Sequence, residues 1–284
     1  TTIPFGDKDS LPIEQLSGNG LSFDINPFGR KITEDELAGI IPNYDALIAG
    51  TEIISKKVID QAKRLKIISR VGIGLDGLDL NYARSKSIKV TYTPEAPAPA
   101  VAELTMALIL NCLRYVNISD SDIKSGHWHR HFGRRIPEVT IGIIGLGRIG
   151  TRVIKRLSGF GSPRILVNDI VADLNPIPNQ KIEFVSKEKI FRESDVVTLH
   201  IPLTKDTKNM VSERVLRTMK SDSILINTAR GGIINELALH KVMSEGHLSA
   251  AAIDVFEQEP YKGPLTELKN IILTAHMGSM SVDC

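Results

Sequence analysis

The stretch Val139-Thr-Ile-Gly-Ile-Ile-Gly-Leu-Gly-Arg-Ile-Gly150 decides the fold of this 284-residue chain. A short β-branched run leads into the pattern Gly-x-Gly-x-x-Gly, and an amphipathic segment, Thr151 to Leu157, follows it. This order predicts a strand, a tight turn and a helix. Gly145 permits the turn, Gly147 lets a pyrophosphate approach the backbone, and Gly150 lets the helix pack closely on the strand. The start of the helix offers free N–H groups and a positive dipole end to the phosphates.

A second apolar run, Arg164 to Asn168, ends in Asp169. An acidic residue about 20 positions beyond such glycines is where a carboxylate accepts a hydrogen bond from an adenosine ribose. A carboxylate there would repel a 2′-phosphate, so the sequence favours NAD over NADP. The alternative is that Asp169 only caps a strand end, and the order strand, turn, helix, strand argues against it.

The composition is that of a globular protein, with 42% hydrophobic and 24% charged residues. A formal charge of +2 gives no argument for a nucleic-acid or anionic-membrane partner. No apolar run reaches the length of a membrane span, and no signal-peptide pattern opens the chain. Two cysteines, Cys112 and Cys284, make neither a disulfide framework nor a metal site. The expected compartment is a reducing cytoplasm, by default rather than by a positive signal. The chain begins at Thr1 and stops at Cys284, and we expect native residues beyond both ends.

The first third of the sequence alternates predicted strands with helices. Helices should start after Thr33, which precedes three acids, and after Ser55. Repeated strand–helix–strand spacing predicts a parallel sheet. The predicted strands are 21–25, 45–49, 65–69 and 88–91.

Residues 93–100 carry three prolines and interrupt this alternation. Proline fits neither a helix interior nor a sheet interior, so we interpret the segment as a hinge or crossover between domains. A helix apolar nearly all round should follow at 101–114, buried on several sides.

The alternation resumes after the glycine turn. Further strands are predicted at 196–199, 223–226, 250–254 and 270–274, with helices at 212–219 and 235–244. Together with the two strands that flank the glycine turn they make six, which suits a doubly wound dinucleotide-binding domain.

Ligands of an open parallel sheet bind at the carboxyl ends of its strands, so the residues that follow each strand are the candidate site. An arginine, Arg230, an acid, Glu259, and a histidine, His276, follow three of these strands. They suit the interconversion of a ketone and an alcohol. The histidine exchanges the proton, a carboxylate holds its ring, and a guanidinium grips a substrate carboxylate at two points.

At this point the motifs resemble one family, the D-isomer-specific 2-hydroxyacid dehydrogenases, and they occur in the family's order from Phe28 onward. The Ser69-Arg70-Val-Gly version of the first motif looks most like the D-3-phosphoglycerate dehydrogenase branch. The matching motifs are Arg70-Val-Gly-Ile-Gly-Leu-Asp-Gly-Leu-Asp79, Val101-Ala-Glu-Leu, Gly126-x-Trp128, Gly142 to Gly150, His200-Ile-Pro-Leu-Thr, Asn227-Thr-Ala-Arg-Gly-Gly, Asp254-Val-Phe-Glu-x-Glu-Pro and Thr274-Ala-His-x-Gly278.

The resemblance implies an α/β fold of two Rossmann-like or flavodoxin-like doubly wound parallel-sheet domains with a cleft between them. Residues 1–95 would form the substrate domain, to which 276–284 return, and 96–275 the NAD-binding domain. It also implies a homodimer, which the helix at 101–114 would suit.

The resemblance assigns roles residue by residue. Arg230 would bind the substrate's carboxylate and keto oxygen, His276 would be the acid/base, and Glu259 its partner. Asp254 would hold the nicotinamide carboxamide and Asp169 the ribose. The full set of cofactor-binding positions is Gly145, Gly147, Arg148, Ile149, Gly150, Asp169, His200, Pro202, Thr207, Thr228, Ala229, Asp254 and Gly278, and the substrate-binding positions are Arg70, Gly72, Ile73 and Gly74. No metal is implied.

Several positions depart from the family pattern, namely Tyr92, Glu95 and Pro97 near the hinge, Gly77 in the first motif, and Ala275 before the histidine. The hinge positions lie beside the expected substrate cleft, so the substrate stays open. We expect a D-2-hydroxyacid such as 3-phosphoglycerate, with glyoxylate or hydroxypyruvate as the alternative. A rival class is a dinucleotide-sensing corepressor, which keeps the same fold and the same three residues.

Trp128 lies among His127, His129 and His131. Alternating histidines suggest a metal cluster at first sight, but no acid or cysteine is adjacent, so a solvated loop is the better interpretation. Trp128 is expected to pack between the domains.

Overall fold

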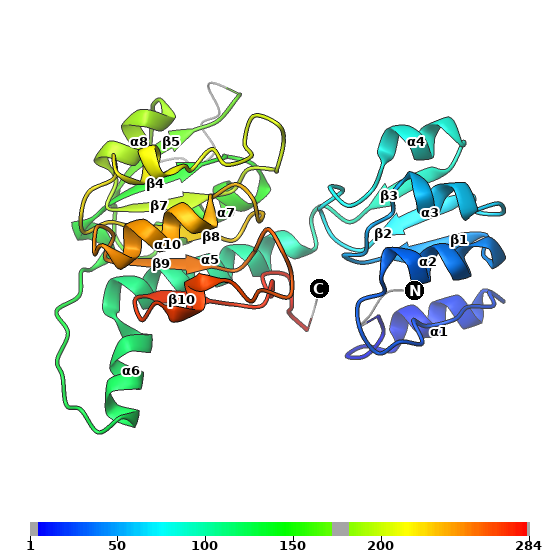
Figure 1. The fold of residues 1–284 in the computed structure, drawn as a ribbon, viewed down its shortest axis with the longest axis horizontal. Coiled ribbons are helices and arrows are strands. Elements are labelled where there is room, and N and C mark those ends of the chain that lie inside the picture. Colours follow the sequence, from blue (N-terminus) through cyan, green and yellow to red (C-terminus); the bar gives the residue numbers. More distant parts are fainter. Residues whose placement is uncertain (1–4, 172–181, 283–284) are drawn as a thin grey trace. The chain divides into compact units, whose positions relative to one another are not determined.

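The computed structural model describes residues 5–171 and 182–282, and the chain divides into two compact units (Figure 1). The first unit runs to Pro97 and includes Ser281 and Val282, and the second is Ala98–Met280. His276 to Met280 therefore belong to the second unit, whereas the resemblance had the chain return to the first domain from His276 on. Cys284 lies outside the described residues.

The first unit is built on a three-stranded parallel sheet in the order β1-β2-β3 (Ala46–Ala49, Ile67–Arg70 and Lys89–Tyr92). Ile41, Ile54 and Ile68 are fully buried in its core. The helix predicted to start after Thr33 is present and begins with a capping box, since Thr33 Oγ1 accepts from Glu36 N–H while the Glu36 carboxylate accepts from Thr33 N–H. The helices of this unit are α1 (Leu11–Gly18), α2 (Glu34–Ile40), η1 (Ile41–Asn43), α3 (Lys56–Gln61) and α4 (Leu80–Ser85).

The strand predicted at 21–25 is wrong. Residues 21–26 carry no regular secondary structure, and Leu21 and Ile25 are 55% and 43% exposed. Alternation of apolar and polar residues specifies a strand only where one face is buried and a neighbour accepts the backbone hydrogen bonds.

The second unit contains a seven-stranded, wholly parallel sheet in the order β10-β9-β8-β7-β4-β5-β6. All six predicted strands are present, and the prediction missed β6. That strand spans only Ile182–Phe184, at the sheet edge, and is too short to show a periodicity. The other strands are β4 (Thr140–Ile144), β5 (Arg164–Asn168), β7 (Val196–Leu199), β8 (Ile224–Asn227), β9 (Ala250–Ile253) and β10 (Ile271–Leu273).

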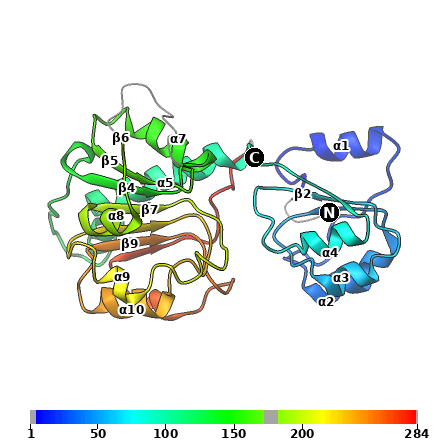
Figure 2. The same ribbon diagram turned by 90° about the horizontal axis from the view of Figure 1, so that it is seen from above.

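Helices cover both faces of this sheet, as expected for a doubly wound fold (Figure 2). Ile141 and Ile143 of β4 pack with α5 and α7 on one face, whereas Ile144 and Val197 pack with α8, α9 and α10 on the other. The α/β fold with parallel sheets is therefore confirmed. The helices of this unit are α5 (Pro97–Arg114), α6 (Val116–Lys124), η2 (Ile136–Glu138), α7 (Arg148–Leu157), α8 (Lys187–Glu193), α9 (Glu213–Leu216), α10 (Glu236–Ser244) and η3 (Pro264–Glu267).

Helix α5 begins four residues before the predicted start at 101, inside the proline-rich segment. Pro97 and Pro99 fall in its first turn, where backbone N–H groups have no partner within the helix. The prolines therefore start the helix, and only residues 93–96 separate it from β3.

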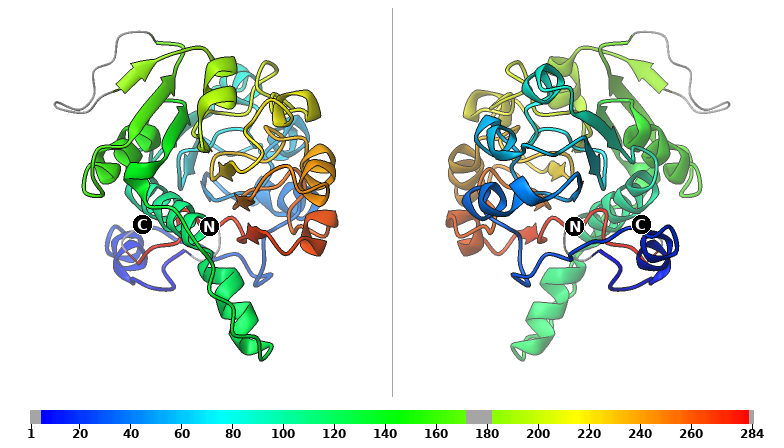
Figure 3. Two further views of the ribbon diagram at one scale, coloured as in Figure 1. Left: turned by 90° about the vertical axis from the view of Figure 1, so that its left-hand side faces the viewer. Right: turned by 90° about the vertical axis from the view of Figure 1, so that its right-hand side faces the viewer.

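Helix α6 extends away from the sheet of the second unit, and a loop returns from its end (Figure 3). Tyr115, in the left-handed region at φ +53°, separates α6 from α5, and the two helices are bent by 61°. Among the described residues no single helix is long and apolar enough to cross a bilayer; only this bent pair together matches in length and composition.

Candidate active site

The glycine turn joins β4 to α7 at one end of the sheet. Gly145 has φ +99°, and a Cβ there would lie 2.4 Å from the carbonyl oxygen of His200. A Cβ on Gly150 would lie 2.1 Å from the carbonyl oxygen of Gly145, whereas one on Gly147 would meet nothing within 4 Å. Two glycines are thus required by the fold, and the third leaves the backbone open to a ligand. Arg148 and Ile149 follow in the first turn of α7.

Asp169 lies beside this turn, at the end of β5. Its Oδ2 accepts a hydrogen bond from Leu146 N–H (2.6 Å), and its Oδ1 accepts from Val171 N–H (2.9 Å). A carboxylate has room for about four such bonds, so it keeps acceptor capacity beside the turn.

His200 follows β7 and supports the glycine turn through the contact of its carbonyl with Gly145. Its Nε2 lies 3.0 Å from Thr198 Oγ1, and its Nδ1 is buried and has no hydrogen-bond partner among the described residues. Burial lowers the pKa of His200 to about 3, so its ring is neutral near pH 7.

Four further predicted cofactor-binding residues follow the next strands. Pro202 and Thr207 form a small turn after β7, and Thr228 and Ala229 follow β8. Thr207 Oγ1 donates to the Pro202 carbonyl (2.7 Å). Thr228 Oγ1 lies 2.9 Å from Thr105 Oγ1 of α5, and both residues are buried. Ala229, next to Thr228, is buried as well.

The loop after β8 carries Arg230. The Asn227 side chain fixes it at both ends, since its Oδ1 accepts from Ala229 N–H (3.0 Å) and its Nδ2 donates to the Arg230 carbonyl (2.9 Å). The Arg230 guanidinium donates to the Ala229 carbonyl (2.6 Å). A Cβ on Gly231 would lie 1.9 Å from the Phe256 carbonyl oxygen, so this glycine allows the Arg230 loop to touch the segment that follows β9.

Glu259 and His276 come from different strand ends and meet. His276 Nδ1 lies 2.9 Å and 3.0 Å from the two carboxylate oxygens of Glu259. Phe256 N–H donates to Glu259 Oε1 (3.2 Å) and so helps to aim that carboxylate. An ionised carboxylate only accepts, so Nδ1 carries a proton and Nε2 is the nitrogen left for exchange with another molecule.

The backbone of His276 is held in the left-handed region, at φ +51°. This conformation costs roughly 1–2 kcal/mol for a residue with a Cβ. Asp254, only 1% exposed, surrounds it with hydrogen bonds. Its carbonyl accepts from His276 N–H (2.8 Å), and its carboxylate accepts from Thr274 Oγ1 (2.6 Å), Met277 N–H (2.9 Å) and Gly278 N–H (3.0 Å).

The predicted substrate-binding residues lie in the first unit, after β2. Arg70 is only 8% exposed, and its Nε donates to the Gly74 carbonyl (2.9 Å). Gly72 has φ +117°, and its N–H donates to Thr93 Oγ1 (2.8 Å). Ile73 lies between these glycines. No group of three or more potential metal ligands occurs within residues 5–171 and 182–282.

Comparison with known proteins decides the family. Residues 106–278 match the model of the D-isomer specific 2-hydroxyacid dehydrogenase, NAD binding domain. The chain belongs to the D-isomer-specific 2-hydroxyacid dehydrogenases. It is thus an NAD-dependent oxidoreductase, and the predicted family, enzyme class and cofactor are confirmed.

Several relatives in this dehydrogenase family are similarly close. The hydroxypyruvate reductase of Thermotoga maritima is 38% identical over 259 residues, which cover 89% of this chain and 83% of the relative. The glyoxylate reductase of Thermofilum pendens is 40% identical over 263 residues, covering 88% and 77%. The D-3-phosphoglycerate dehydrogenase of Methanocaldococcus jannaschii is 38% identical over 254 residues, covering 87% and 48%. The phosphoglycerate dehydrogenase branch is therefore one of several equally similar groups.

A solved structure extends the likeness of this dehydrogenase to the whole fold. The D-lactate dehydrogenase of Aquifex aeolicus, complexed with NAD and lactic acid, superposes with a TM-score of 0.86 at 28% identity. The match covers 99% of this chain and 88% of that one.

The sequence missed two contributions to the geometry of this dehydrogenase. Asp254 was expected only as a cofactor contact, whereas it organises the turn that presents His276. Glu236, whose carboxylate accepts from Glu257 N–H, was not considered at all. The polar Thr274 and the small Gly278, which flank the histidine in the sequence, could have indicated the role of Asp254. For Glu236 there was no such signal, because its partner is a backbone amide 21 residues away.

Proposed function

We propose that this dehydrogenase reduces a small 2-ketoacid, glyoxylate or hydroxypyruvate, to the D-2-hydroxyacid. The observation that carries the proposal is the hydrogen-bonded pair Glu259–His276 at the edge of the sheet that also carries Arg230 and the glycine turn. Relatives named for these two substrates match most of the chain. Arg70, the residue that suggested a phosphorylated substrate, is 8% exposed, and its Nε donates to the carbonyl of Gly74 in its own loop.

In this proposal each of the three residues has one task. Arg230 binds the substrate carboxylate and polarises the neighbouring carbonyl. His276 Nε2 gives its proton to the carbonyl oxygen as negative charge develops there, and Glu259 stabilises the charged ring that acts as the donor. NADH, when bound, supplies the hydride. The backbone of Gly72 to Gly74 contributes a further contact to the substrate carboxylate.

The residues around the glycine turn fit a dinucleotide. The open space at Gly147 admits a pyrophosphate, and the N-terminus of α7 offers it N–H groups. Asp169 has spare acceptor capacity for a ribose hydroxyl. We assign Arg148, Ile149, His200, Pro202, Thr207, Thr228, Ala229, Asp254 and Gly278 to the same cofactor site.

A screen of substrates tests the proposal. NADH oxidation is followed with glyoxylate, hydroxypyruvate, pyruvate and 3-phosphohydroxypyruvate. We expect kcat/KM to be highest for glyoxylate or hydroxypyruvate. A clear preference for the phosphorylated acid would overturn the substrate assignment, and a protein that binds NADH but reduces none of the four would favour a dinucleotide sensor.

We further propose that the enzyme works as a homodimer, with the arm formed by α6 and residues 125–135 as the contact. The helix expected to carry the dimer, α5, directs Ala102, Ile109 and Leu113 into the core of its own unit. The arm exposes apolar side chains instead, namely Val116 (56%), Ile123 (51%), Trp128 (85%) and Phe132 (96%). Exposed apolar surface of this kind marks protein contacts. The packing of Trp128 between the domains stays a prediction, and its side chain is 85% exposed here.

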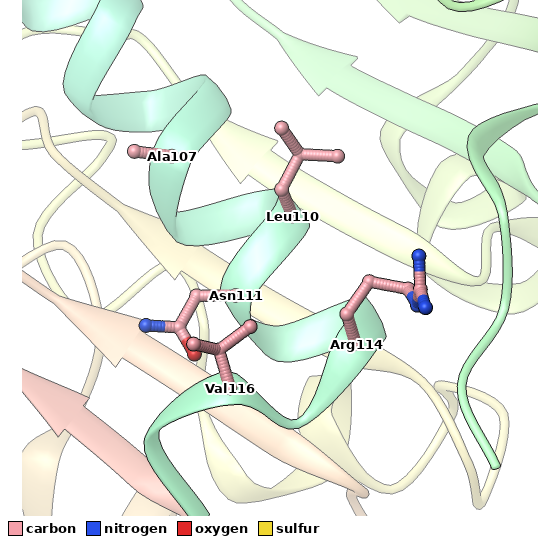
Figure 4. Close-up of a pocket in the computed structure, with 5 residues that line it drawn as sticks. All are labelled: Ala107, Leu110, Asn111, Arg114 and Val116. Carbon is pink, nitrogen blue, oxygen red and sulfur yellow. The ribbon is translucent and has the colours of Figure 1, made fainter. Parts of the chain in front are cut away.

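A shallow pocket continues this surface at the bend between α5 and α6 (Figure 4). It is lined by Ala107, Leu110, Asn111, Arg114 and Val116. Its lining combines the apolar Ala107, Leu110 and Val116 with the polar Asn111 and Arg114, and it shares Val116 with the arm. In a symmetric dimer each copy would offer both the exposed side chains of the arm and this pocket.

Analytical ultracentrifugation tests the dimer. Trp128→Ala with Phe132→Ala should raise the dimer dissociation constant at least tenfold. Phe160→Ala, which removes a 44% exposed aromatic side chain outside the arm, is the matched control. A wild-type protein that is monomeric at 50 times its assay concentration, or a double variant that dimerises normally, would contradict the proposal. The expected cytoplasmic location stays a prediction.

A further inference from the structure

The backbone turn at Phe256 and Glu257 is a shared support of the candidate active site. Gly231, which follows Arg230, packs directly against it, and a Cβ there would lie within 2.6 Å of three of its atoms. The N–H of Phe256 donates to Glu259 Oε1 (3.2 Å). The next N–H, that of Glu257, donates to Glu236 Oε1 (2.7 Å). Two consecutive amides of one turn thus bind two different carboxylates.

Glu236 is the first residue of α10, directly after Asn235, whose side chain caps that helix. It is partly buried, and burial raises the pKa of its carboxyl group, helped by the negative charges of Glu257 and Glu259. The hydrogen bond from Glu257 N–H works in the opposite direction. An acid that serves only the helix dipole does so from solvent and needs no distant partner. Glu236 instead gives up solvation to hold a backbone amide 21 residues further along the chain.

We propose that Glu236 is a positioning residue for the dehydrogenase reaction. Its carboxylate fixes the 256–257 peptide, which packs against Gly231 of the Arg230 loop and adjoins the 255–256 peptide, whose N–H donates to Glu259. The inference rests on the proposed function of Glu259 and His276. Removing the Glu236 acceptor frees the 256–257 peptide to rotate, and the change passes through Phe256 to the neighbouring peptide, whose N–H donates to Glu259. Errors of about 1 Å in the position of catalytic groups cost up to about 100-fold in rate.

Three variants separate the effect of the length of the Glu236 side chain from the effect of its charge. Glu236→Gln keeps an acceptor oxygen at the same reach but loses the charge. Glu236→Asp keeps the charge but draws the carboxylate back by one methylene group. Glu236→Ala removes both. We expect kcat to fall about 10- to 100-fold in the Ala and Asp variants, with the KM for NADH unchanged, and to recover to within about threefold of wild type in the Gln variant.

Glu188→Ala is the matched control, because Glu188 is an exposed acid in the first turn of another helix of the same unit. Its kcat should equal that of the wild type. If Glu188→Ala loses as much kcat as Glu236→Ala, or Glu236→Gln is as slow as Glu236→Ala, or Glu236→Asp is as fast as wild type, the positioning role is refuted.

Hydrogen exchange gives a readout that does not depend on activity. Peptides that cover residues 255–260 should exchange faster in Glu236→Asp than in wild type and at the wild-type rate in Glu236→Gln. Glu236→Asp serves here because it keeps the acid at the helix start if Glu236→Ala fails to fold. Unchanged exchange in Glu236→Asp would overturn the inference. A wild-type protein that reduces no ketoacid would instead refute the proposed function and leave this exchange experiment to decide the role of Glu236.

Discussion

The turns at Gly145 and His276 both have positive φ and both follow the carboxyl ends of strands in the second unit, but they are built in opposite ways. The turn at Gly145 reaches φ +99° with a glycine, which bears no cost there. The turn at His276 reaches φ +51° with a side chain that the chemistry needs, so glycine is not an option. The first turn is possible because Gly145 has no Cβ that would clash with the His200 carbonyl. The second turn is held by hydrogen bonds to the buried carboxylate of Asp254. The glycine turn can thus be recognised from a short stretch of sequence, whereas the turn at His276 depends on hydrogen bonds to a side chain more than 20 positions away.

The largest expected effect comes from filling the glycine turn. Gly145→Ala places a Cβ 2.4 Å from the His200 carbonyl in a left-handed conformation, so both the melting temperature and the affinity for NADH should collapse. Gly147→Ala meets nothing within 4 Å, so the fold should stay intact while NADH binds at least tenfold more weakly. Differential scanning fluorimetry and fluorescence titration check both. If the two variants had the same melting temperature and the same affinity for NADH, Gly145 would not be required by the fold more than Gly147 is.

A smaller effect is expected from the support of the second turn. In Asp254→Asn, one side-chain oxygen becomes an NH2 group that cannot accept from the N–H groups it faces. Leaving a buried donor unsatisfied costs about 1–3 kcal/mol of stability, and we expect kcat to fall about 10- to 100-fold as the histidine loses its position. Asp206→Asn, in a loop, is the control and should behave as wild type. Normal turnover in Asp254→Asn would show that His276 keeps its place without this carboxylate.

The smallest effect concerns acid stability at His200, which lies between the two turns. The unfolded chain takes up a proton at this histidine below about pH 6.5, whereas the folded protein resists it until about pH 3. Stability should therefore decrease as pH falls through this window. Glutamine does not titrate, so the melting temperature of His200→Gln should decline less between pH 6.5 and pH 4 than that of the wild type. If the melting temperatures of the two proteins fell by the same amount, His200 would not resist protonation in the folded protein.

The contrast between the turns at Gly145 and His276 also explains which parts of the site the sequence could predict. The glycine turn, Asp169 and the residues after each strand were predictable, because short-range pattern and the geometry of parallel sheets determine them. The bonds from Asp254 and Glu236 were not, because they join backbone amides to side chains 21 to 24 positions away.

The fold predictions failed where local pattern lacked its tertiary partner. Residues 21–25 alternate as a strand does but have no buried face. Pro97 and Pro99 were assigned to a hinge before the helix at 101–114, whereas they lie in the first turn of that helix. The exposure of Trp128 and Phe132 could not be inferred from the residues around them, because aromatic side chains are more often packed than exposed.

The proposed role of the Glu259–His276 pair is proton transfer beside a bound dinucleotide. Single-turnover oxidation of enzyme-bound NADH by glyoxylate or hydroxypyruvate, compared between wild type and His276→Ala, tests it most directly. We predict that the rate falls about 10²- to 10⁴-fold while the dissociation constant of NADH stays within threefold of the wild-type value. A wild-type rate in the variant, or a loss of NADH binding that accounts for the whole decrease, would contradict it.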